Sequence, residues 1–267
     1  MVRSILNTIG IYVAILAYTF GIRQSVTLEN LKYAYPELSS GERNKIAKAS
    51  YRNLAIIFAE MLYLRFASRK NIAKHITVTN PELFHHSIDQ GKGLIVVAGH
   101  FANWEWLALG GALSLKKSFA VVRKNIHAWE KFMEKMRLRT GNELINSGDI
   151  RKMYRIINNG GCIAMLADQA APGESVRVNF FGREVPTFEG PARLALRTRA
   201  AMLFAACLRT ENGDYAITFH PILFDDLIGD NHDNIKELTA RHTRMLEEVI
   251  RLHPDQWLWQ HKRWKYV

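Results

Sequence analysis

From residue 76 onward the chain repeats one pattern, a short and continuously apolar run followed by a segment of helical character. The runs are ITVT (76–79), LIVVA (94–98), FAVV (119–122), CIAMLA (162–167), AMLFAACL (201–208) and YAITFHPI (215–222). Strands that are apolar on both faces belong to sheets that are covered on both sides, and such sheets are mostly parallel. The sequence therefore predicts an α/β fold with a mostly parallel central sheet flanked by helices.

The segment VRVNFFGREV (176–185) departs from this pattern. Gly182 is a turn signal between two β-rich flanks, so a local hairpin or an extended loop is expected over one end of the sheet. Internal repeats and Pro/Ser-rich linkers are not found in the sequence. We therefore predict a single α/β domain over residues 25–267.

The amino-terminal segment has a different character, because residues 4–22 carry no charge and are apolar on every face. This length is marginal for a membrane-spanning helix, and polar residues such as Asn7 weaken it further. A cleaved signal peptide is not expected, because Arg3 is the only basic residue before the apolar run and no small-x-small site follows it. We predict a membrane-associating helix over residues 1–24, which either spans the bilayer or lies in it. The alternative is a buried core helix.

A long helix is predicted next. Ser39 precedes Glu42 by three residues, the spacing of a capping box. Apolar residues then recur at three- and four-residue steps up to about Phe66, as in a helix packed on one side. These residues are Ile46, Ala49, Leu54, Ile57, Phe58, Met61 and Leu62.

Composition narrows the partners. The net charge of +11 favours anionic partners, such as a phosphorylated lipid or an acidic carrier protein. Nucleic acid is not expected, because the basic residues are spread along the chain without a recognisable binding module. Cys162 and Cys207 both lie in apolar runs, where a cysteine usually acts as a small buried hydrophobe, so a reducing compartment is expected.

A histidine and a glutamate follow the run LIVVA, in the segment GHFANWEW (99–106). Gly99 allows a sharp turn that places His100 at the carboxyl edge of the sheet, where ligand sites gather. His100 and Glu105 can meet if His100 lies in the turn and Glu105 in the first helical turn. The carboxylate would then fix the imidazole tautomer, and the imidazole would take a proton from a substrate hydroxyl. The alternative is an ordinary helix start, where Glu105 favours the dipole and His100 caps.

Other polar residues follow the neighbouring apolar runs. FAVV leads to Arg123, Lys124 and Asn125, and CIAMLA leads to Asp168 and Gln169. Arg123 suits a phosphate or carboxylate, unless it is a solvated loop cation. Asp168 either orders a loop or touches substrate.

A further helix start lies in the run TFEGPAR (187–193), whose free amides and arginine suit an anion or a developing oxyanion. The alternative is a plain helix signal with proline near the first turn.

A zinc site is disfavoured, because the His100 motif is not His-Glu-x-x-His and no third ligand is suggested by spacing. We expect no metal and no cofactor. The three tryptophans of the terminal QWLWQHKRWKYV are expected as core or interface anchors, and this basic tail also suits a lipid headgroup boundary.

Several of these segments together resemble the bacterial lipid A biosynthesis lauroyl/myristoyl acyltransferases, which are members of the lysophospholipid acyltransferase superfamily. The segments are GHFANWEW (99–106), VVRKN (121–125), ADQ (167–169), FFG (180–182), EGPARLALRT (189–198) and QWLWQHKRWK (256–265), and the match begins near NLKYAYPE (30–37). The amino terminus looks shorter than that of members with a full membrane helix.

The resemblance implies a glycerolipid acyltransferase-like fold and transfer of a fatty acyl chain from acyl-acyl carrier protein to a hydroxyl of a phosphorylated lipid A precursor. The place implied is the cytoplasmic face of the bacterial inner membrane. His100 and Glu105 are implied as the catalytic pair of an HX4(D/E) motif. The residues expected to bind substrate are Asn103, Arg123, Asp168, Gln169, Glu189, Gly190 and Arg193.

Three alternatives remain open. Related family members acylate other membrane lipids, such as phosphatidylinositol mannosides or amino-acid-linked lipids. A second possibility is a non-catalytic, lipid-binding scaffold with the same fold, although the intact motifs count against it. A hydrolase of acyl esters or thioesters would normally need a G-x-S-x-G nucleophile elbow, which the sequence lacks.

Overall fold

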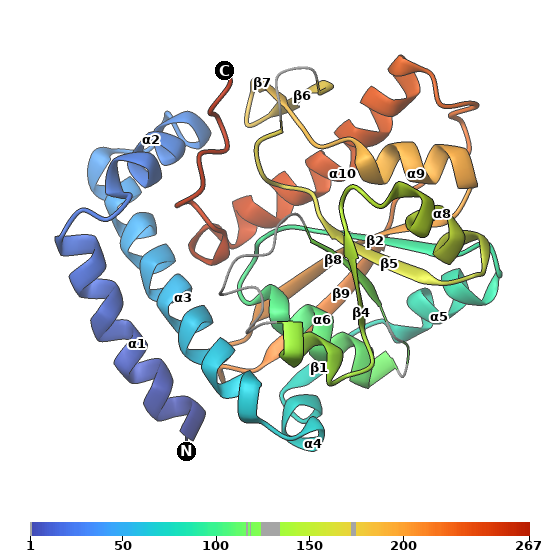
Figure 1. The fold of residues 1–267 in the computed structure, drawn as a ribbon. Coiled ribbons are helices and arrows are strands. Elements are labelled where there is room, and N and C mark those ends of the chain that lie inside the picture. Colours follow the sequence, from blue (N-terminus) through green and yellow to red (C-terminus); the bar gives the residue numbers. More distant parts are fainter. Residues whose placement is uncertain (1, 116, 118, 124–133, 172–174) are drawn as a thin grey trace.

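The computed structural model describes residues 2–115, 117, 119–123, 134–171 and 175–267, and Figure 1 shows its fold. A seven-stranded sheet has the order β1-β9-β8-β2-β5-β3-β4, and β6 pairs with β7 in a separate hairpin. The strands are β1 (Ile76–Val78), β2 (Leu94–Ala98), β3 (Ala120–Arg123), β4 (Glu143–Asn146), β5 (Cys162–Leu166), β6 (Arg177–Phe180), β7 (Arg183–Pro186), β8 (Ala201–Arg209) and β9 (Tyr215–Pro221). Within the seven-stranded sheet, β8 and β9 pair antiparallel and the other neighbours pair parallel.

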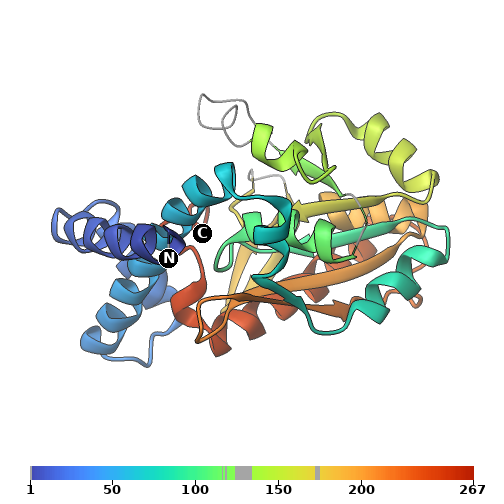
Figure 2. The same ribbon diagram turned by 90° about the horizontal axis from the view of Figure 1, so that it is seen from below.

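Helices cover both faces of this sheet, as Figures 1 and 2 show. They are α1 (Val2–Thr19), α2 (Gln24–Ala34), α3 (Ser40–Phe66), α4 (Arg69–Ala73), α5 (Pro81–Asp89), α6 (Trp104–Leu115), α8 (Ile150–Asn158), α9 (Gly190–Thr198) and α10 (His232–Leu252), followed by the short 3-10 helix η1 (Pro254–Gln256). The α/β fold with a mostly parallel central sheet is therefore confirmed.

Strand β2 illustrates why these strands are apolar throughout. Ile95 and Val97 face the core that contains residues of α8, α9 and α10, whereas Leu94, Val96 and Ala98 face the core that contains residues of α5 and α6. All five residues are buried. Successive side chains of a strand point to opposite faces, so a strand between two helical layers has no polar side.

The predicted runs all became strands, and the segment with Gly182 became the antiparallel hairpin β6–β7. Helix α3 begins with the predicted capping box, in which Ser39 and Glu42 bond reciprocally. The prediction that α3 packs on one side only is wrong for two of its residues, because Phe58 and Leu62 are 50% and 45% exposed. This helix lies between α1 and the body of the protein, so its buried positions spread around the helix.

Helix α1 lies along α3, with the two helices at one end of the sheet in both views (Figures 1 and 2). Its small residues face α3: a Cβ at Gly10 would lie 2.8 Å from the carbonyl oxygen of Ala55, and Ala14 is buried. Most of its large apolar side chains are at least half exposed. These are Ile5, Ile9, Tyr12, Val13, Ile15 and Leu16, and Phe20 directly after the helix is exposed as well. The helix therefore buries one side, where Ala14 packs with Tyr51 and Ala55, and its exposed apolar side requires a separate explanation.

No single helix among the described residues has both the length and the apolar character needed to cross a membrane. The segments Arg3–Thr19 and Gln24–Ala34 meet that condition only when taken together, and they are bent by 87° at the break between them.

The carboxyl-terminal segment runs between the amino-terminal helices and the sheet (Figures 1 and 2). Asn30 of α2 donates hydrogen bonds to the carbonyl oxygens of Trp259 and His261. Trp257, Trp259 and Trp264 are all buried. They are core anchors, as expected, and being buried inside the protein they do not supply the lipid headgroup boundary that the tail also suggested.

Candidate active site

The turn after β2 is built around Gly99. A Cβ at this position would lie 2.5 Å from Cδ1 of Leu246 and 3.2 Å from Oδ2 of Asp168. Any side chain would therefore displace the end of the Leu246 side chain or the carboxylate of Asp168. The turn ends at Ala102, whose φ of 37° is rare for a residue other than glycine.

His100 meets Asp168 at this edge of the sheet. Strands β2 and β5 are neighbours in parallel register, with Ala98 opposite Leu166, so the two residues lie at equal distance beyond their strands. Nδ1 of His100 lies 2.6 Å from Oδ1 of Asp168, and the backbone N–H of His100 donates to Oδ2 at 2.7 Å. This two-point contact fixes both the position and the orientation of the imidazole ring.

The carboxyl-terminal segment completes the surroundings of Asp168. Nε1 of Trp257 donates to its Oδ2 at 2.9 Å, and Phe101 forms a β-bridge with Trp257. Burial by itself would raise the pKa of Asp168. The positive charge and hydrogen bonds of His100, together with the Trp257 bond, outweigh burial and lower the pKa to about 2. The group is therefore a carboxylate at neutral pH.

The far side of the His100 ring is more open. The side chain is 15% exposed, compared with 2% for that of Asp168. Nε2 of His100 lies 3.4 Å from Nε2 of Gln169, and the ring of Trp104 lies edge-on at 4.8 Å between centroids. With Nδ1 donating to Asp168, the neutral form of the ring has its lone pair on Nε2. A group with this geometry can accept a proton from a hydroxyl brought to Nε2.

The predicted contact between His100 and Glu105 is wrong. Both oxygens of Glu105 accept hydrogen bonds from Arg137, at 2.9 Å from Nε and 2.6 Å from Nη2. Both side chains are buried, at 1% and 10% exposed. Glu105 lies in the first turn of α6, as expected, but its carboxylate points to a cation from a distant segment while Asp168 binds the imidazole.

Asn103 does not face an open site. It is fully buried, its Oδ1 accepts from the backbone N–H of Glu105 at 3.1 Å, and its Nδ2 donates to Glu60 at 3.2 Å. It acts as a cap for helix α6, because its oxygen satisfies one of the free amides of the first turn. Asp168 is likewise 3% exposed, so we infer that it acts on His100 rather than on a substrate.

The structure gives less detail on the other residues that were expected at this edge. Gln169 is exposed beside His100. The backbone of Arg123 ends β3, and Val121 two residues earlier pairs with Ala164 of β5, so β3 ends at the same edge. The side chain of Arg123, and both Lys124 and Asn125, lie outside the described residues.

The start of α9 forms its own local network. Glu189 accepts from Nε of Arg193 at 2.5 Å and from the backbone N–H of Val176 at 3.3 Å, and Gly190 begins the helix. A bridge between Ala170 and Thr187 brings this segment next to the residues that follow β5. Within the described part of the chain, no hydrogen bond or ion pair joins Glu189, Gly190 or Arg193 to His100.

Sequence reasoning missed two residues here. Arg137 lies in a helical stretch at 134–138 that carries no motif. Its role becomes visible only through its contact with Glu105 in the folded structure. Trp257 was expected only as an anchor, and the tryptophan-rich tail gave no sign that one indole would hold Asp168. Among residues 2–115, 117, 119–123, 134–171 and 175–267, no set of three or more His, Cys, Asp or Glu side chains forms a candidate metal site.

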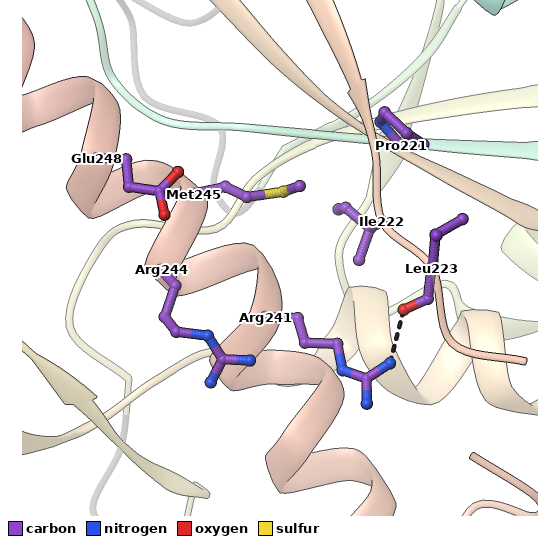
Figure 3. A pocket seen from close by; sticks show the side chains of 7 residues that line it. All are labelled: Pro221, Ile222, Leu223, Arg241, Arg244, Met245 and Glu248. Atoms are coloured by element: carbon purple, nitrogen blue, oxygen red, sulfur yellow. Dashed lines mark hydrogen bonds between the residues drawn. The ribbon is translucent and has the colours of Figure 1, made fainter. Parts of the chain in front are cut away.

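A separate surface hollow of about 320 Å³ lies between α10 and the segment after β9 (Figure 3). Two arginines border it, but both are engaged: Arg241 pairs with Asp226 and Glu237, and Arg244 with Glu237. Arg241 also donates to the carbonyl oxygen of Leu223, as Figure 3 shows. The residues of the His100 site do not line this hollow, so we do not assign it to the chemistry.

The sequence model of the family described as bacterial lipid A biosynthesis acyltransferase matches residues 1–266. The lipid A biosynthesis palmitoleoyltransferase of Escherichia coli (strain K12) is 25% identical over 248 residues, covering 91% of this chain and 79% of the relative. The lipid A biosynthesis lauroyltransferase of the same organism is 23% identical, with the same two coverages. The phosphatidylinositol mannoside acyltransferase of Mycobacterium tuberculosis (strain ATCC 25618 / H37Rv) is 22% identical, covering 81% of this chain and 69% of the relative.

Proposed function

Since the chain belongs to the bacterial lipid A biosynthesis acyltransferase family and is an acyltransferase, we propose that it moves a fatty acyl chain from acyl-acyl carrier protein to a hydroxyl of a lipid A precursor. The observation that carries the mechanism is the pair formed by Nδ1 of His100 and Oδ1 of Asp168. This pair leaves the opposite ring nitrogen ready to act on the acceptor.

In the proposed reaction, Nε2 of His100 removes the proton of the acceptor hydroxyl as its oxygen attacks the thioester carbonyl. The oxygen forms the new ester bond, the carbon–sulfur bond breaks, and the thiolate takes the proton from the imidazolium. Asp168 keeps the ring in the productive tautomer and stabilises the imidazolium that forms. The step needs no covalent enzyme intermediate.

Glu105 has a different role in this proposal. Its two-point ion pair with Arg137 ties the first turn of α6 to the helical stretch at 134–138. The His100 turn leads directly into this end of α6. The pair therefore holds the helix start in place.

The donor and acceptor are proposed from chemistry. An acidic carrier protein and a phosphorylated glycolipid both suit a chain with a net charge of +11. Two of the relatives described above are named as lipid A enzymes, and the mycobacterial one is named as a phosphatidylinositol mannoside acyltransferase. That last relative makes another membrane lipid the alternative acceptor.

The test is to incubate the purified protein with acyl-carrier thioesters and fractionated membrane lipids, and to identify the acylated product by mass spectrometry. Wild-type protein should acylate a lipid A precursor, whereas the His100→Ala variant should lose about 10²- to 10⁴-fold in rate. His86→Ala is the matched control, because His86 is an exposed histidine of α5. Full activity of His100→Ala would refute the mechanism, and acylation of another lipid class would replace the acceptor.

We also propose that the protein works on the cytoplasmic face of the inner membrane, with α1 as the membrane-associating segment. Most large apolar side chains of α1 are exposed, and α3 adds Phe58, Leu62 and Phe66 at four-residue steps on the helix against which α1 packs. An exposed apolar surface of this kind is typical of a helix that lies in the interface of a bilayer.

Vesicle flotation tests this part. Wild-type protein should float with vesicles of phosphatidylethanolamine and phosphatidylglycerol, and the double variant Val13→Asp/Leu16→Asp should stay in the dense fraction. The control Gln90→Asp/Asn158→Asp adds the same charge at exposed positions far along the chain. Flotation that survives the α1 changes would remove α1 from the contact.

A further inference from the structure

A second buried carboxylate, Glu60, lies behind the active-site helix. It belongs to α3 and is fully buried. Its Oε2 accepts from Nδ2 of Asn103 at 3.2 Å, from Nε1 of Trp106 at 3.0 Å and from the hydroxyl of Tyr215. A buried charge is stable only when it is paired and hydrogen-bonded. These three hydrogen bonds therefore hold the carboxylate and its donors together.

The charge of this group is balanced from β8. Nη2 of Arg209 lies 3.7 Å from Oε2 of Glu60, and the Arg209 guanidinium also donates to the Tyr215 hydroxyl. Burial and the neighbouring carboxylate raise the pKa of Tyr215 well above its usual value. The phenol therefore stays protonated and remains a donor to Glu60.

The other oxygen of Glu60 faces the amino-terminal helix. Oε1 accepts from Nδ2 of Asn7, at 3.2 Å. One turn earlier on α1, Arg3 donates to Asp214 at 2.8 Å, and its guanidinium lies 5.8 Å from the ring centroid of Trp106. These polar contacts are unexpected on a helix whose side chains are mostly apolar. Asn7 is connected to α6 through Glu60, and Arg3 through the ring of Trp106.

We propose that Glu60 is a positioning residue for acyl transfer, which joins α1 through one oxygen to the start of α6 through the other. Its partner Asn103 caps the amide of Glu105, and Trp106 is the next residue along the helix. Displacement of this carboxylate would move the first turn of α6, and with it the His100 turn that precedes it. This inference rests on the proposed function, because it assigns Glu60 to the same reaction.

The main test is kinetic. Glu60→Gln keeps the size of the side chain but leaves a neutral oxygen for three donors, and we expect kcat to fall about 10- to 100-fold because a small misplacement of reacting groups is costly. KM for donor and acceptor should stay the same, since Glu60 does not reach the substrates. Leu64→Ala is the control: Leu64 is buried in the same helix and its side chain cannot form a hydrogen bond, so the change lowers thermal stability without removing a hydrogen bond of Glu60. Equal kcat values for Glu60→Gln and wild type would overturn the inference, as would an equal loss in Leu64→Ala.

A double-mutant cycle tests the link to α1, and its Asn7→Ala arm does not depend on how well Glu60→Gln folds. Asn7→Ala should lower kcat about 3-fold in the wild-type background and have no further effect in Glu60→Gln, because contacting residues are not additive. If Glu60→Gln does not fold, an unchanged kcat in Asn7→Ala alone overturns the proposal and a reduced one supports it.

Hydrogen exchange separates this inference from the proposed function. Amides at the start of α6 should exchange faster in Glu60→Gln than in Leu64→Ala, and this needs no turnover. Absence of acyl transfer in the wild-type protein would refute the proposed function, whereas unchanged exchange at α6 would refute the positioning role alone.

Discussion

Two acidic side chains at the same end of the molecule have different partners. Asp168 follows β5 and binds the imidazole of His100, whereas Glu105 begins α6 and binds the guanidinium of Arg137. Both are almost fully buried. The carboxylate five residues from the histidine in sequence is therefore not its partner, and the partner comes from the neighbouring strand.

The difference follows from geometry. His100 lies in the turn before α6 and Glu105 in the first helical turn, but both oxygens of Glu105 are bound by the guanidinium of Arg137. Adjacent parallel strands end side by side, and the Ala98–Leu166 register places His100 and Asp168 level with each other. One region is thus built to orient a base, and the other to fix the helix that follows it.

The largest expected effect is that of Asp168→Asn. An asparagine offers one acceptor oxygen where three donors now converge: the backbone N–H and Nδ1 of His100, and Nε1 of Trp257. We expect kcat to fall about 10²- to 10⁴-fold, since the base loses its tautomer and orientation. Asp149→Asn, at the exposed start of α8, removes the same charge and should keep wild-type kcat. Similar kcat values for Asp168→Asn and Asp149→Asn would show that Asp168 does not orient the base.

Glu105→Gln should lower the stability of the protein more than it disturbs the position of His100. The change replaces the carboxylate that binds two nitrogens of Arg137 with a neutral amide, and breaking a buried ion pair of this kind costs about 3–5 kcal/mol in the free energy of unfolding. The rate should fall less than in Asp168→Asn, by about 10- to 100-fold, through movement of α6.

Urea denaturation and steady-state rates measure the two effects of Glu105→Gln. A double variant, Glu105→Gln/Arg137→Met, should recover much of the stability, because it removes both buried charges. A deeper rate loss in Glu105→Gln than in Asp168→Asn would reverse the assignment of the two carboxylates.

The acid stability of the protein should depend on Asp168. Its folded-state pKa of about 2 lies below the value of 3.8 for the free group, so the stabilisation is complete above pH 4 and is lost as the pH falls toward 2. The shift corresponds to about 2 kcal/mol. The difference in unfolding free energy between wild type and Asp168→Asn should therefore narrow by that amount between pH 5 and pH 2. A constant difference across this range would mean that the carboxylate is not held by His100.

The smallest effect is expected for Trp257→Phe. It removes one of the hydrogen bonds to Asp168 but leaves both contacts with His100, and a single bond of this kind contributes about 1 kcal/mol. A rate loss of about 2- to 10-fold is expected, measured as kcat with saturating substrates. A loss as large as that of Asp168→Asn would show that the indole, rather than the imidazole, is the main partner.

Much of the sheet could be predicted from the sequence, because strands buried on both faces leave an unbroken apolar signal. LIVVA and CIAMLA are examples, and the polar residues that end them, His100 and Asp168, were both identified. Strand β4, with its single buried residue, and the polar-surfaced helices α8 and α10 gave no comparable signal.

The pairing of residues could not be predicted, since it depends on strand order. Strand β5 lies beside β2 although β3 and β4 come between them in sequence. Arg137 comes from a segment without any motif, so its contact with Glu105 is visible only in three dimensions. The orientation of α1 likewise depends on α3, although small residues at Gly10 and Ala14 were a sign of close helix packing.

The most direct test of the account is the NMR signal of the Nδ1 proton of His100, followed in protein labelled with ¹⁵N at histidine. The account predicts a downfield resonance that is present in wild type, kept in Glu105→Gln and lost or strongly shifted in Asp168→Asn. A resonance that is lost or strongly shifted in Glu105→Gln and unchanged in Asp168→Asn would contradict it.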